Sequence, residues 1–316
     1  MTGGNGMLAR SIKDSWDRLR PDDELIVVRR EDADLTDAVA TKAMIRGARP
    51  EIVLHAAARV GGIAANIADP AGFLMDNLLI DSSVLKAAFD LGVEKVVYFG
   101  SSCMYPRDYR QPLMEADLLA APLEPTNEGY ALSKIVAAKY CEYVADQFGR
   151  SFRVVIPSNL YGPDDDYSLG HGHLVAAAIA KAHAAKLAGS TQIGVWGDGT
   201  ALREFTYVGD LASWVVANLD RIDSWPTMMN LGFGRDHSVL DYYQAAMEVV
   251  GWKCELVLDT SKPAGMHQKL MSSDVAKQHG WAPQTELLDG MRIAYRRFLD
   301  VSPTNNSHST RETPTQ

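Results

Sequence analysis

The chain has 316 residues, of which 47% are hydrophobic and 22% are charged, and its net charge at pH 7 is −9. This length and apolar share suffice for one large hydrophobic core or two joined ones. The negative charge leaves no basic surface for a phosphate backbone, so nucleic acid is excluded as an expected partner.

Cysteine content and hydropathy point to the compartment. Cys103, Cys141 and Cys254 are an odd number with no close pair, which favours neither a disulfide framework nor a metal site. The chain does not start with a basic stretch followed by an apolar one, and its most apolar long window, residues 173–189, is interrupted by two lysines and a histidine. We therefore expect a cytoplasmic protein with no membrane span and no bound metal.

A glycine-rich loop stands at the start of the chain, where residues 2–9 read TGGNGMLA. A helix is expected directly after it, over residues 7–19. Glycines let backbone amides approach a pyrophosphate at the positive end of such a helix. We predict that this loop binds a dinucleotide through Gly3, Asn5, Gly6 and Met7.

Such a loop normally follows a strand, yet only Met1 and Thr2 precede Gly3. In a doubly wound sheet this first strand is central, so its loss would expose several side chains whose burial is worth about 1.5–3 kcal/mol each. That sum exceeds the total stability of many domains, which is about 5–15 kcal/mol. The first strand is apparently missing, and we expect the natural chain to begin a few residues upstream.

The next expected strand, over residues 24–30, ends in Arg29 and Arg30. Guanidinium groups suit the 2′-phosphate of NADP, whereas NAD favours a carboxylate at this point. NADP (as NADPH) is therefore the expected cofactor, although the two arginines could equally form a solvated strand end. Asp34 and Leu35 would then border the adenine.

Further β-branched runs alternate with segments of helical length, and strands are expected at 51–57, 95–101 and 153–162. This alternation predicts an α/β protein with a Rossmann-type doubly wound parallel sheet. Ala57, at the end of one strand, would lie beside the cofactor. The pattern weakens near residue 160 and returns later. We expect an NADP-binding domain over 1–160 and 204–234, a smaller α/β substrate-binding domain over 161–203 and 235–301, and a disordered tail over 302–316.

Ser101 ends one expected strand, and Tyr130 and Lys134 lie four residues apart on a helix expected over 128–144. Taken alone, Ser101 could merely fill a strand end. A phenol has a pKa near 10, and a neighbouring ammonium favours its ionised form. We predict that Lys134 tunes Tyr130, that both of them also bind the cofactor, and that Ser101 holds a substrate oxygen. Tyr130 would pass a proton to a carbonyl that receives a hydride from the nicotinamide.

Six stretches carry a resemblance to a known family, and in chain order they read AAARVGGIAAN, GSSCMYPRD, LEPTNEGYALSK, SNLYGPDDD, VWGDGTALREFTYVGDL and SKPAGMHQKL. From the glycine loop to about residue 300, the chain resembles the extended short-chain dehydrogenase/reductase superfamily and, more closely, the GDP-L-fucose synthase family. That family epimerises carbons 3 and 5 of GDP-4-keto-6-deoxymannose and reduces carbon 4 with NADPH. The resemblance implies the same activity here, and a homodimer formed through helices near 70–92 and 127–149.

The resemblance also implies roles for individual residues. Cys103 and His173 would exchange the two protons as base and acid, in an order that the sequence leaves open. As a lone loop histidine, His173 could also be merely solvated. The expected substrate-binding residues are Asn159 near the reacting carbons, Lys181, Arg203 and Lys269 toward the diphosphate, and Trp196 against the nucleotide or in the core.

Some positions depart from the family. Ala264 and Gln268 replace an acidic and a basic residue, Lys181 replaces an arginine, and Asn5 replaces an arginine in the glycine loop. Lysine lacks the bidentate fork of arginine, so the contacts to the nucleotide must differ. An alternative is therefore a reductase or epimerase acting on another nucleotide sugar, such as a heptose derivative. A second alternative is a non-catalytic NADP-binding protein.

Overall fold

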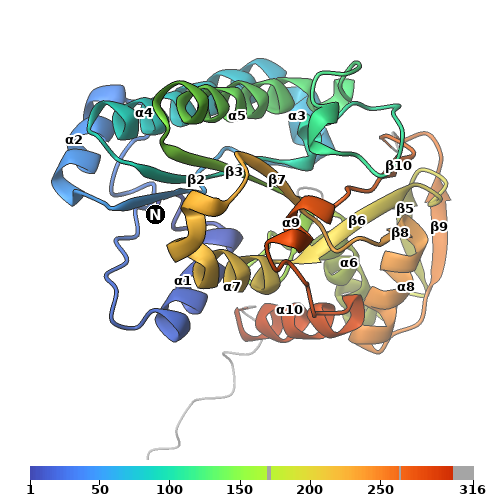
Figure 1. Ribbon diagram of the computed structural model, residues 1–316. Helices are drawn as coiled ribbons and strands as arrows, with labels where there is room; N and C mark the ends of the chain where they lie inside the picture. The colour runs from blue at the N-terminus through green and yellow to red at the C-terminus, as the bar shows by residue number, and fades with distance from the viewer. Residues whose placement is uncertain (169–171, 263–264, 302–316) are drawn as a thin grey trace, which may run out of the picture.

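The structure is a computed structural model that describes residues 1–168, 172–262 and 265–301 (Figure 1). Ala264 and the tail that we predicted to be disordered, 302–316, lie outside the described residues.

A four-stranded parallel sheet forms the centre of the first half, as the alternating pattern predicted. Its strands are short apolar runs, and most of their side chains are buried, as is usual where helices cover both faces of a parallel sheet. In spatial order the strands are β1 (Ile52–His55), β2 (Lys95–Phe99), β3 (Ser151–Pro157) and β7 (Met228–Leu231).

Helices cover both faces of this sheet (Figure 1). On one face α4 (Pro70–Asp90) packs against α5 (Glu128–Phe148) and α2 (Ala38–Ala48). On the other face α1 (Met7–Leu19) packs against α7 (Val208–Asn218). The sheet is therefore doubly wound, and the helices expected after the glycine loop and around Tyr130 are both present.

The strand expected over residues 24–30 is not formed. The residues beside it are Met1 and Thr2, and Thr2 makes single parallel bridges to Val28 and to His55. The amide of Thr2 donates to the carbonyl of Leu54, and that of Val28 to Met1. A strand needs a continuous ladder partner. The prediction of a strand is therefore wrong, and only the bridge at Val28 is formed.

The second half contains smaller sheets. Strand β6 (Leu202–Tyr207) pairs with β4 (Asn159–Tyr161), β10 (Gln268–Lys269) and, antiparallel, β8 (Asp236–Ser238). The domain boundaries predicted at 160 and 204 thus fall inside two strands that pair with each other, and the division stays a prediction. Also in this half are β5 (Gln192–Trp196), its partner β9 (Glu255–Asp259), α6 (Leu174–Ala188), α8 (Val239–Val250), α9 (Asp274–Gln278) and α10 (Leu287–Val301).

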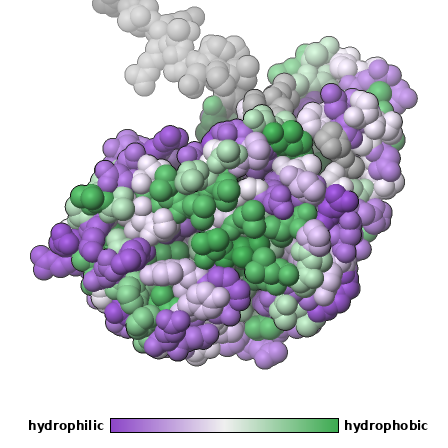
Figure 2. All heavy atoms as spheres, turned by 90° about the horizontal axis from the view of Figure 1, so that it is seen from above, coloured by the Kyte–Doolittle hydropathy of each residue, from purple (hydrophilic) through white to green (hydrophobic). Residues whose placement is uncertain are grey.

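One face of the molecule is markedly apolar. Figure 2, seen from above Figure 1, shows hydrophobic side chains gathered over the helical layer that contains α4 and α5. Within the described ranges, none of the helices is both long and apolar enough to span a membrane. The large exposed apolar side chains of these two helices are Met75, Leu79, Leu132, Val136, Tyr143 and Phe148.

Candidate active site

The glycine loop has the geometry of an anion-binding turn. Gly3 has φ +82°, and a Cβ there would lie 2.7 Å from the backbone nitrogen of Ala57. Gly6 is the N-cap of α1, and no side chain of the described residues caps that helix start. The first-turn amides of α1 therefore remain available to a phosphate group, so this loop fits the pyrophosphate of a dinucleotide. Met7 is the first residue of that helix.

The residues expected around the ribose and the adenine lie beyond the loop. Asn5 donates from Nδ2 to Glu31 Oε2 over 3.0 Å, and this bond lowers the pKa of Glu31. Arg30 is exposed, Asp34 accepts from the amide of Thr36, and Leu35 packs against the core. Both a carboxylate and a guanidinium are thus close to this edge, and the choice of Arg30 as a 2′-phosphate ligand stays a prediction.

Ser101 and Tyr130 lie together at the carboxyl end of β2. Ser101 is the N-cap of a 3₁₀ turn, η1 (Ser102–Met104), and its Oγ accepts from the amide of Cys103 over 3.2 Å. Tyr130, in the first turn of α5, hydrogen-bonds to Ser101. Burial raises the pKa of Tyr130, and the neighbouring groups Cys103 and Asp81 raise it further. The phenol is therefore held in its protonated form.

Lys134 is paired with a carboxylate in this structure. Its buried ammonium lies 3.5 Å from Oδ2 of Asp81 on α4, and 4.7 Å from the centre of the Tyr98 ring. The charge of Lys134 is thus balanced by a carboxylate. Burial is the main cause of the raised pKa of Tyr130, with Cys103 and Asp81 adding to it, and the tuning of Tyr130 by Lys134 stays a prediction.

Cys103 lies among polar and basic side chains. Asn127, in the loop before α5, donates from Nδ2 to the thiol sulfur over 3.1 Å. Nζ of Lys269, on β10, lies 3.8 Å from the same sulfur. Arg203, on β6, also faces Cys103 and Glu124, although burial lowers the pKa of its guanidinium. The structure therefore brings two of the predicted diphosphate ligands to the thiol.

His173 is the N-cap of α6, and its side chain is 44% exposed. Its Nδ1 lies 3.9 Å from Oδ1 of Asp165. The interaction with Asp165 raises the pKa of His173, burial opposes this, and Asp166 adds to it. His173 is thereby suited to carry a proton. His171, the other histidine of this loop, lies outside the described residues.

The remaining predicted substrate residues are more scattered. Nδ2 of Asn159 donates to the carbonyl of Glu204. Nζ of Lys181 donates to the carbonyl of Gly194, and burial lowers its pKa. Trp196 is 42% exposed, so it does not fill the core, and it remains available to a ligand. Unlike Lys269, Lys181 makes its contacts away from Cys103, with Gly194 and Tyr243.

Four residues of this site were missed in the sequence: His55, Asp81, Asn127 and Asp165. Asp81 had a signal, since it is a lone acid in the apolar run LLIDSSVL of a helix. Asn127 begins the stretch NEGYALSK, and Asp165 lies in the acidic run DDD, where no single residue stands out. Among the described residues, no group of three or more potential ligands could hold a metal ion.

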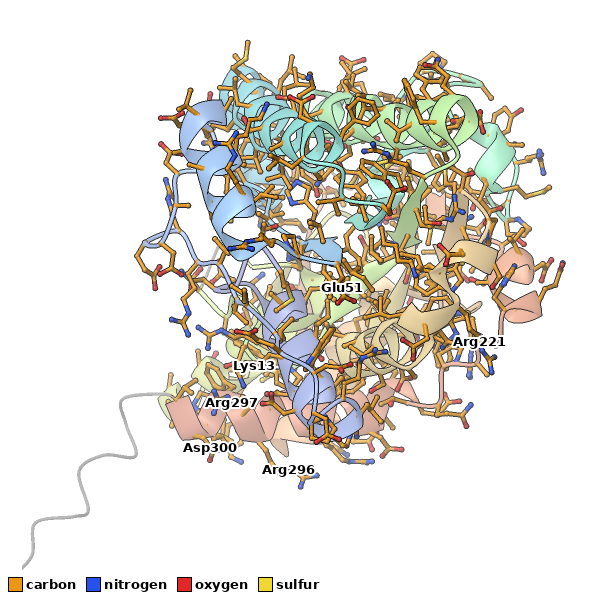
Figure 3. All side chains as sticks on the ribbon, turned by 60° about the vertical axis from the view of Figure 1, so that its left-hand side comes forward. Lys13, Glu51, Arg221, Arg296, Arg297 and Asp300 are labelled. Atoms are coloured by element: carbon orange, nitrogen blue, oxygen red, sulfur yellow. The ribbon has the colours of Figure 1, made fainter. Side chains whose placement is uncertain are left out.

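A charged hollow lies away from these residues. A hollow of about 540 Å³ lies between α1 and α10 and is lined by charged side chains. Figure 3 shows Lys13 of α1 beside Arg297 of α10, with Arg296 and Asp300 nearby. Arg297 and Arg10 both pair with Asp164, so much of this charge is neutralised internally. None of the predicted catalytic residues lines this hollow, and we do not assign the reaction to it.

Comparison with known proteins identifies the family. Residues 1–232 match the model of the NAD dependent epimerase/dehydratase family. The chain belongs to this family. A GDP-L-fucose synthase of Azorhizobium caulinodans is 40% identical over 304 residues, covering 95% of each chain. A GDP-L-colitose synthase of Yersinia pseudotuberculosis is 35% identical, covering 95% of this chain and 97% of its own.

A solved relative has the same fold. The GDP-mannoheptose C4 reductase of Campylobacter jejuni, with NADP bound, is 30% identical and has a TM-score of 0.85. The match covers 94% of this chain and 96% of the reductase. The Rossmann-type fold and the membership in the extended short-chain dehydrogenase/reductase superfamily, both predicted from the sequence, are confirmed.

Proposed function

We propose that this protein is an NADPH-dependent epimerase-reductase that inverts carbons 3 and 5 of a GDP-4-keto-6-deoxy sugar and reduces carbon 4, giving GDP-L-fucose or a close analogue. One observation carries the proposal: Cys103 lies in the same 3₁₀ turn that Ser101 caps, beside Tyr130. Groups for proton exchange at carbon and for ketone reduction thus adjoin one another. The similarity to GDP-L-fucose synthase supports this reading.

The glycine loop is the proposed NADPH site. Gly3, Gly6 and Met7 would hold the pyrophosphate, Arg30 the 2′-phosphate, and Ala57 would line the floor beside Gly3. NADPH, when bound, supplies the hydride for carbon 4. The bound NADP of the mannoheptose reductase supports this choice of cofactor. The side chain of Asn5 is hydrogen-bonded to Glu31, so it would contribute to cofactor binding by ordering the glycine loop.

For the reduction, we assign the proton to Tyr130. Ser101 Oγ accepts a hydrogen bond from the amide of Cys103 and interacts with Tyr130, so the two hydroxyls are neighbours and would bind the same substrate carbonyl oxygen. A raised pKa keeps the Tyr130 proton in place until the carbonyl oxygen gains negative charge. Tyr130 then acts as a general acid and Ser101 as a hydrogen-bond donor to the same oxygen.

For the epimerisations, we assign the base to Cys103 and the acid to His173. Protons beside a ketone are acidic because the enolate spreads its charge onto oxygen, and inversion needs a base on one face and an acid on the other. Asn127 and Lys269 face the sulfur with N–H groups, which suit an anion. Asp165 raises the pKa of His173, which suits a proton donor.

The rest of the proposal concerns the residues that would bind the nucleotide portion of the substrate. Arg203 is the proposed ligand of the diphosphate, with Lys181 and Trp196 toward the nucleotide and Asn159 near the sugar. Gln268 is held by Asp236, to which its Nε2 donates over 2.8 Å, and it supplies no cation. A GDP-heptose 4-reductase is therefore the second candidate, favoured by this loss of charge in the substrate loop.

We also propose a homodimer in the cytoplasm. Six large apolar side chains of α4 and α5 are exposed on one face (Figure 2), and a second copy of the same face would cover them. Cys103, Cys141 and Cys254 are all free thiols, which suits a reducing compartment.

A turnover assay separates the candidates. The protein is mixed with NADPH and either GDP-4-keto-6-deoxymannose or a GDP-4-keto-heptose, and the loss of NADPH absorbance is followed. Faster oxidation with the deoxymannose substrate, giving GDP-L-fucose, supports the proposal. Oxidation with the heptose alone favours the second candidate, and binding of NADPH without any turnover contradicts both.

A further inference from the structure

A buried chain of polar groups connects Thr2, beside the glycine loop, to Lys134. Thr2 Oγ1 lies 2.7 Å from His55 Nδ1, and His55 Nε2 lies 3.0 Å from Asp81 Oδ1. The second carboxylate oxygen of Asp81 accepts from the hydroxyl of Tyr98 over 2.7 Å and lies 3.5 Å from Nζ of Lys134. All five side chains are almost completely buried.

The protonation states within this buried chain of polar groups follow from its contacts. Burial would raise the pKa of Asp81, but Lys134, His55 and Tyr98 outweigh it and leave the pKa lowered, so the carboxylate is charged. Burial lowers the pKa of His55, so the ring is neutral. Since a carboxylate only accepts, His55 must donate from Nε2 and accept at Nδ1 from the hydroxyl of Thr2. Asp81 thus accepts hydrogen bonds from His55 and Tyr98 and forms an ion pair with Lys134.

The charge balance beside Tyr130 follows from this arrangement. A buried ammonium alone would favour the phenolate of Tyr130. Asp81 lies against that ammonium and places a negative charge near the phenol, which raises the pKa of Tyr130 in addition to burial and Cys103. A dehydrogenase working in the oxidative direction needs the phenolate as a base, whereas a reductase needs the phenol as an acid.

We propose that Asp81 is a positioning residue that pairs with Lys134 and so keeps Tyr130 protonated, which biases the site toward carbonyl reduction. This inference rests on the proposed role of Tyr130 as the proton donor. Tyr98 and His55 hold the carboxylate in place from β2 and β1, and Thr2 fixes the tautomer of His55 beside the glycine loop.

Other groups face this cluster from each packed element. Cys141, on α5, is buried, and burial raises its pKa to a range in which it stays a neutral thiol. The amino group of Met1 faces His55, and burial lowers its pKa to about 6. Ser101 and Cys103 face Tyr130 from η1. Asp81 is therefore the carboxylate that we place against the Lys134 ammonium.

The test titrates Tyr130 without substrate or cofactor. Phenolate absorbance is recorded against pH, and the curve of a Tyr130→Phe variant is subtracted to isolate this residue. In the wild type we expect no Tyr130 phenolate below about pH 10, the ordinary phenol value. Asp81→Asn removes the negative charge, and the phenolate should then appear about 1–3 pH units lower. The high-pH limit of ketone reduction should move down by the same amount.

Two variants complete the design. Asp81→Glu keeps the charge and should restore the wild-type titration, while Tyr98→Phe removes a hydrogen bond but no charge and should leave it nearly unchanged. An unchanged curve in Asp81→Asn overturns the proposal, even if that variant melts at a lower temperature. If Asp81→Asn does not fold, the wild-type curve decides, because a Tyr130 phenolate near neutral pH contradicts the proposal whatever the substrate is.

Discussion

Asn127 donates a hydrogen bond from Nδ2 to the sulfur of Cys103 over 3.1 Å, and this bond joins the loop before α5 to the turn after β2. The amide oxygen of Asn127 is buried without a partner among the described residues. The bond therefore orients the side chain toward the sulfur, at the expense of an unsatisfied oxygen.

Asn127→Ala should slow the epimerisations more than the reduction. A single hydrogen bond is worth about 0.5–1.5 kcal/mol, which corresponds to about a 2- to 10-fold loss of rate. The measurement is the exchange of substrate protons at carbons 3 and 5 with D₂O in the absence of NADPH. Asn218→Ala, which removes a side-chain bond to the carbonyl of Trp214 far from the site, is the control and should exchange at the normal rate.

Tyr130→Phe should abolish most of the reduction. Losing a general acid costs about 10²- to 10⁴-fold in kcat. NADPH binding and proton exchange at carbons 3 and 5 should persist, because Gly3 and Cys103 are untouched. Stopped-flow oxidation of NADPH measures the loss, and Tyr140→Phe on the same helix is the matched control. Equal losses in both variants would argue against a proton-donating role for Tyr130.

His173 gives a pH prediction with a definite sign. Its pKa is raised chiefly by Asp165, so the imidazolium persists to a higher pH than in an unfolded chain. Asp165→Asn should move the high-pH limit of proton exchange to lower pH. The stabilising effect of this pair is complete below the unfolded histidine pKa and is lost as pH rises through the raised folded value. Asp164→Asn serves as the control, and a limit that moves equally in both variants would contradict the assignment.

The sequence predicted most of the fold because local signals encode it. The Gly3 and Gly6 pattern placed α1 correctly, and the spacing of Tyr130 and Lys134 placed both on α5. The prediction of a strand over 24–30 was wrong because a strand depends on its ladder partner, which the local sequence does not contain. The pairing of Asp81 with Lys134 across two helices was also invisible, since burial and charge balance arise only from tertiary packing.

Glu204 predicts how stability depends on pH. Burial raises the pKa of this carboxyl to about 7, although the amides of Gly234 and Met271 donate to it. The unfolded chain releases this proton near the ordinary value of about 4.3, so stability should fall by about 3 kcal/mol between pH 4 and 7 and then level off. In Glu204→Gln this part of the pH dependence should vanish. Chemical denaturation across this pH range measures both.

The Glu204→Gln variant also separates the hydrogen bonds of this side chain from its charge. Glu204→Gln places an amide NH₂ against one of the two backbone donors, so the variant should be less stable at low pH by about 1–3 kcal/mol. A pH slope identical to that of the wild type would mean that Glu204 does not titrate in this range. Glu248→Gln, an exposed change on α8, should leave both the slope and the stability unchanged.

The apolar face of α4 and α5 predicts an oligomer. Val136 is 56% exposed at the middle of α5, and Val136→Asp would place a carboxylate inside the proposed dimer interface. Sedimentation should show a dimer for the wild type and a monomer for the variant. Val257→Asp, on β9 and also exposed, is the control and should sediment like the wild type. A monomeric wild type would rule out the dimer.

The most direct test of the account is to run the complete reaction in D₂O with NADPH and GDP-4-keto-6-deoxymannose and to locate deuterium in the product. The account predicts a product with inverted carbons 3 and 5, each carrying deuterium, and a Cys103→Ser variant that loses or misdirects this incorporation. A wild-type product reduced at carbon 4 but free of deuterium at carbons 3 and 5 would contradict it, because Cys103 and His173 would then exchange no protons with the sugar.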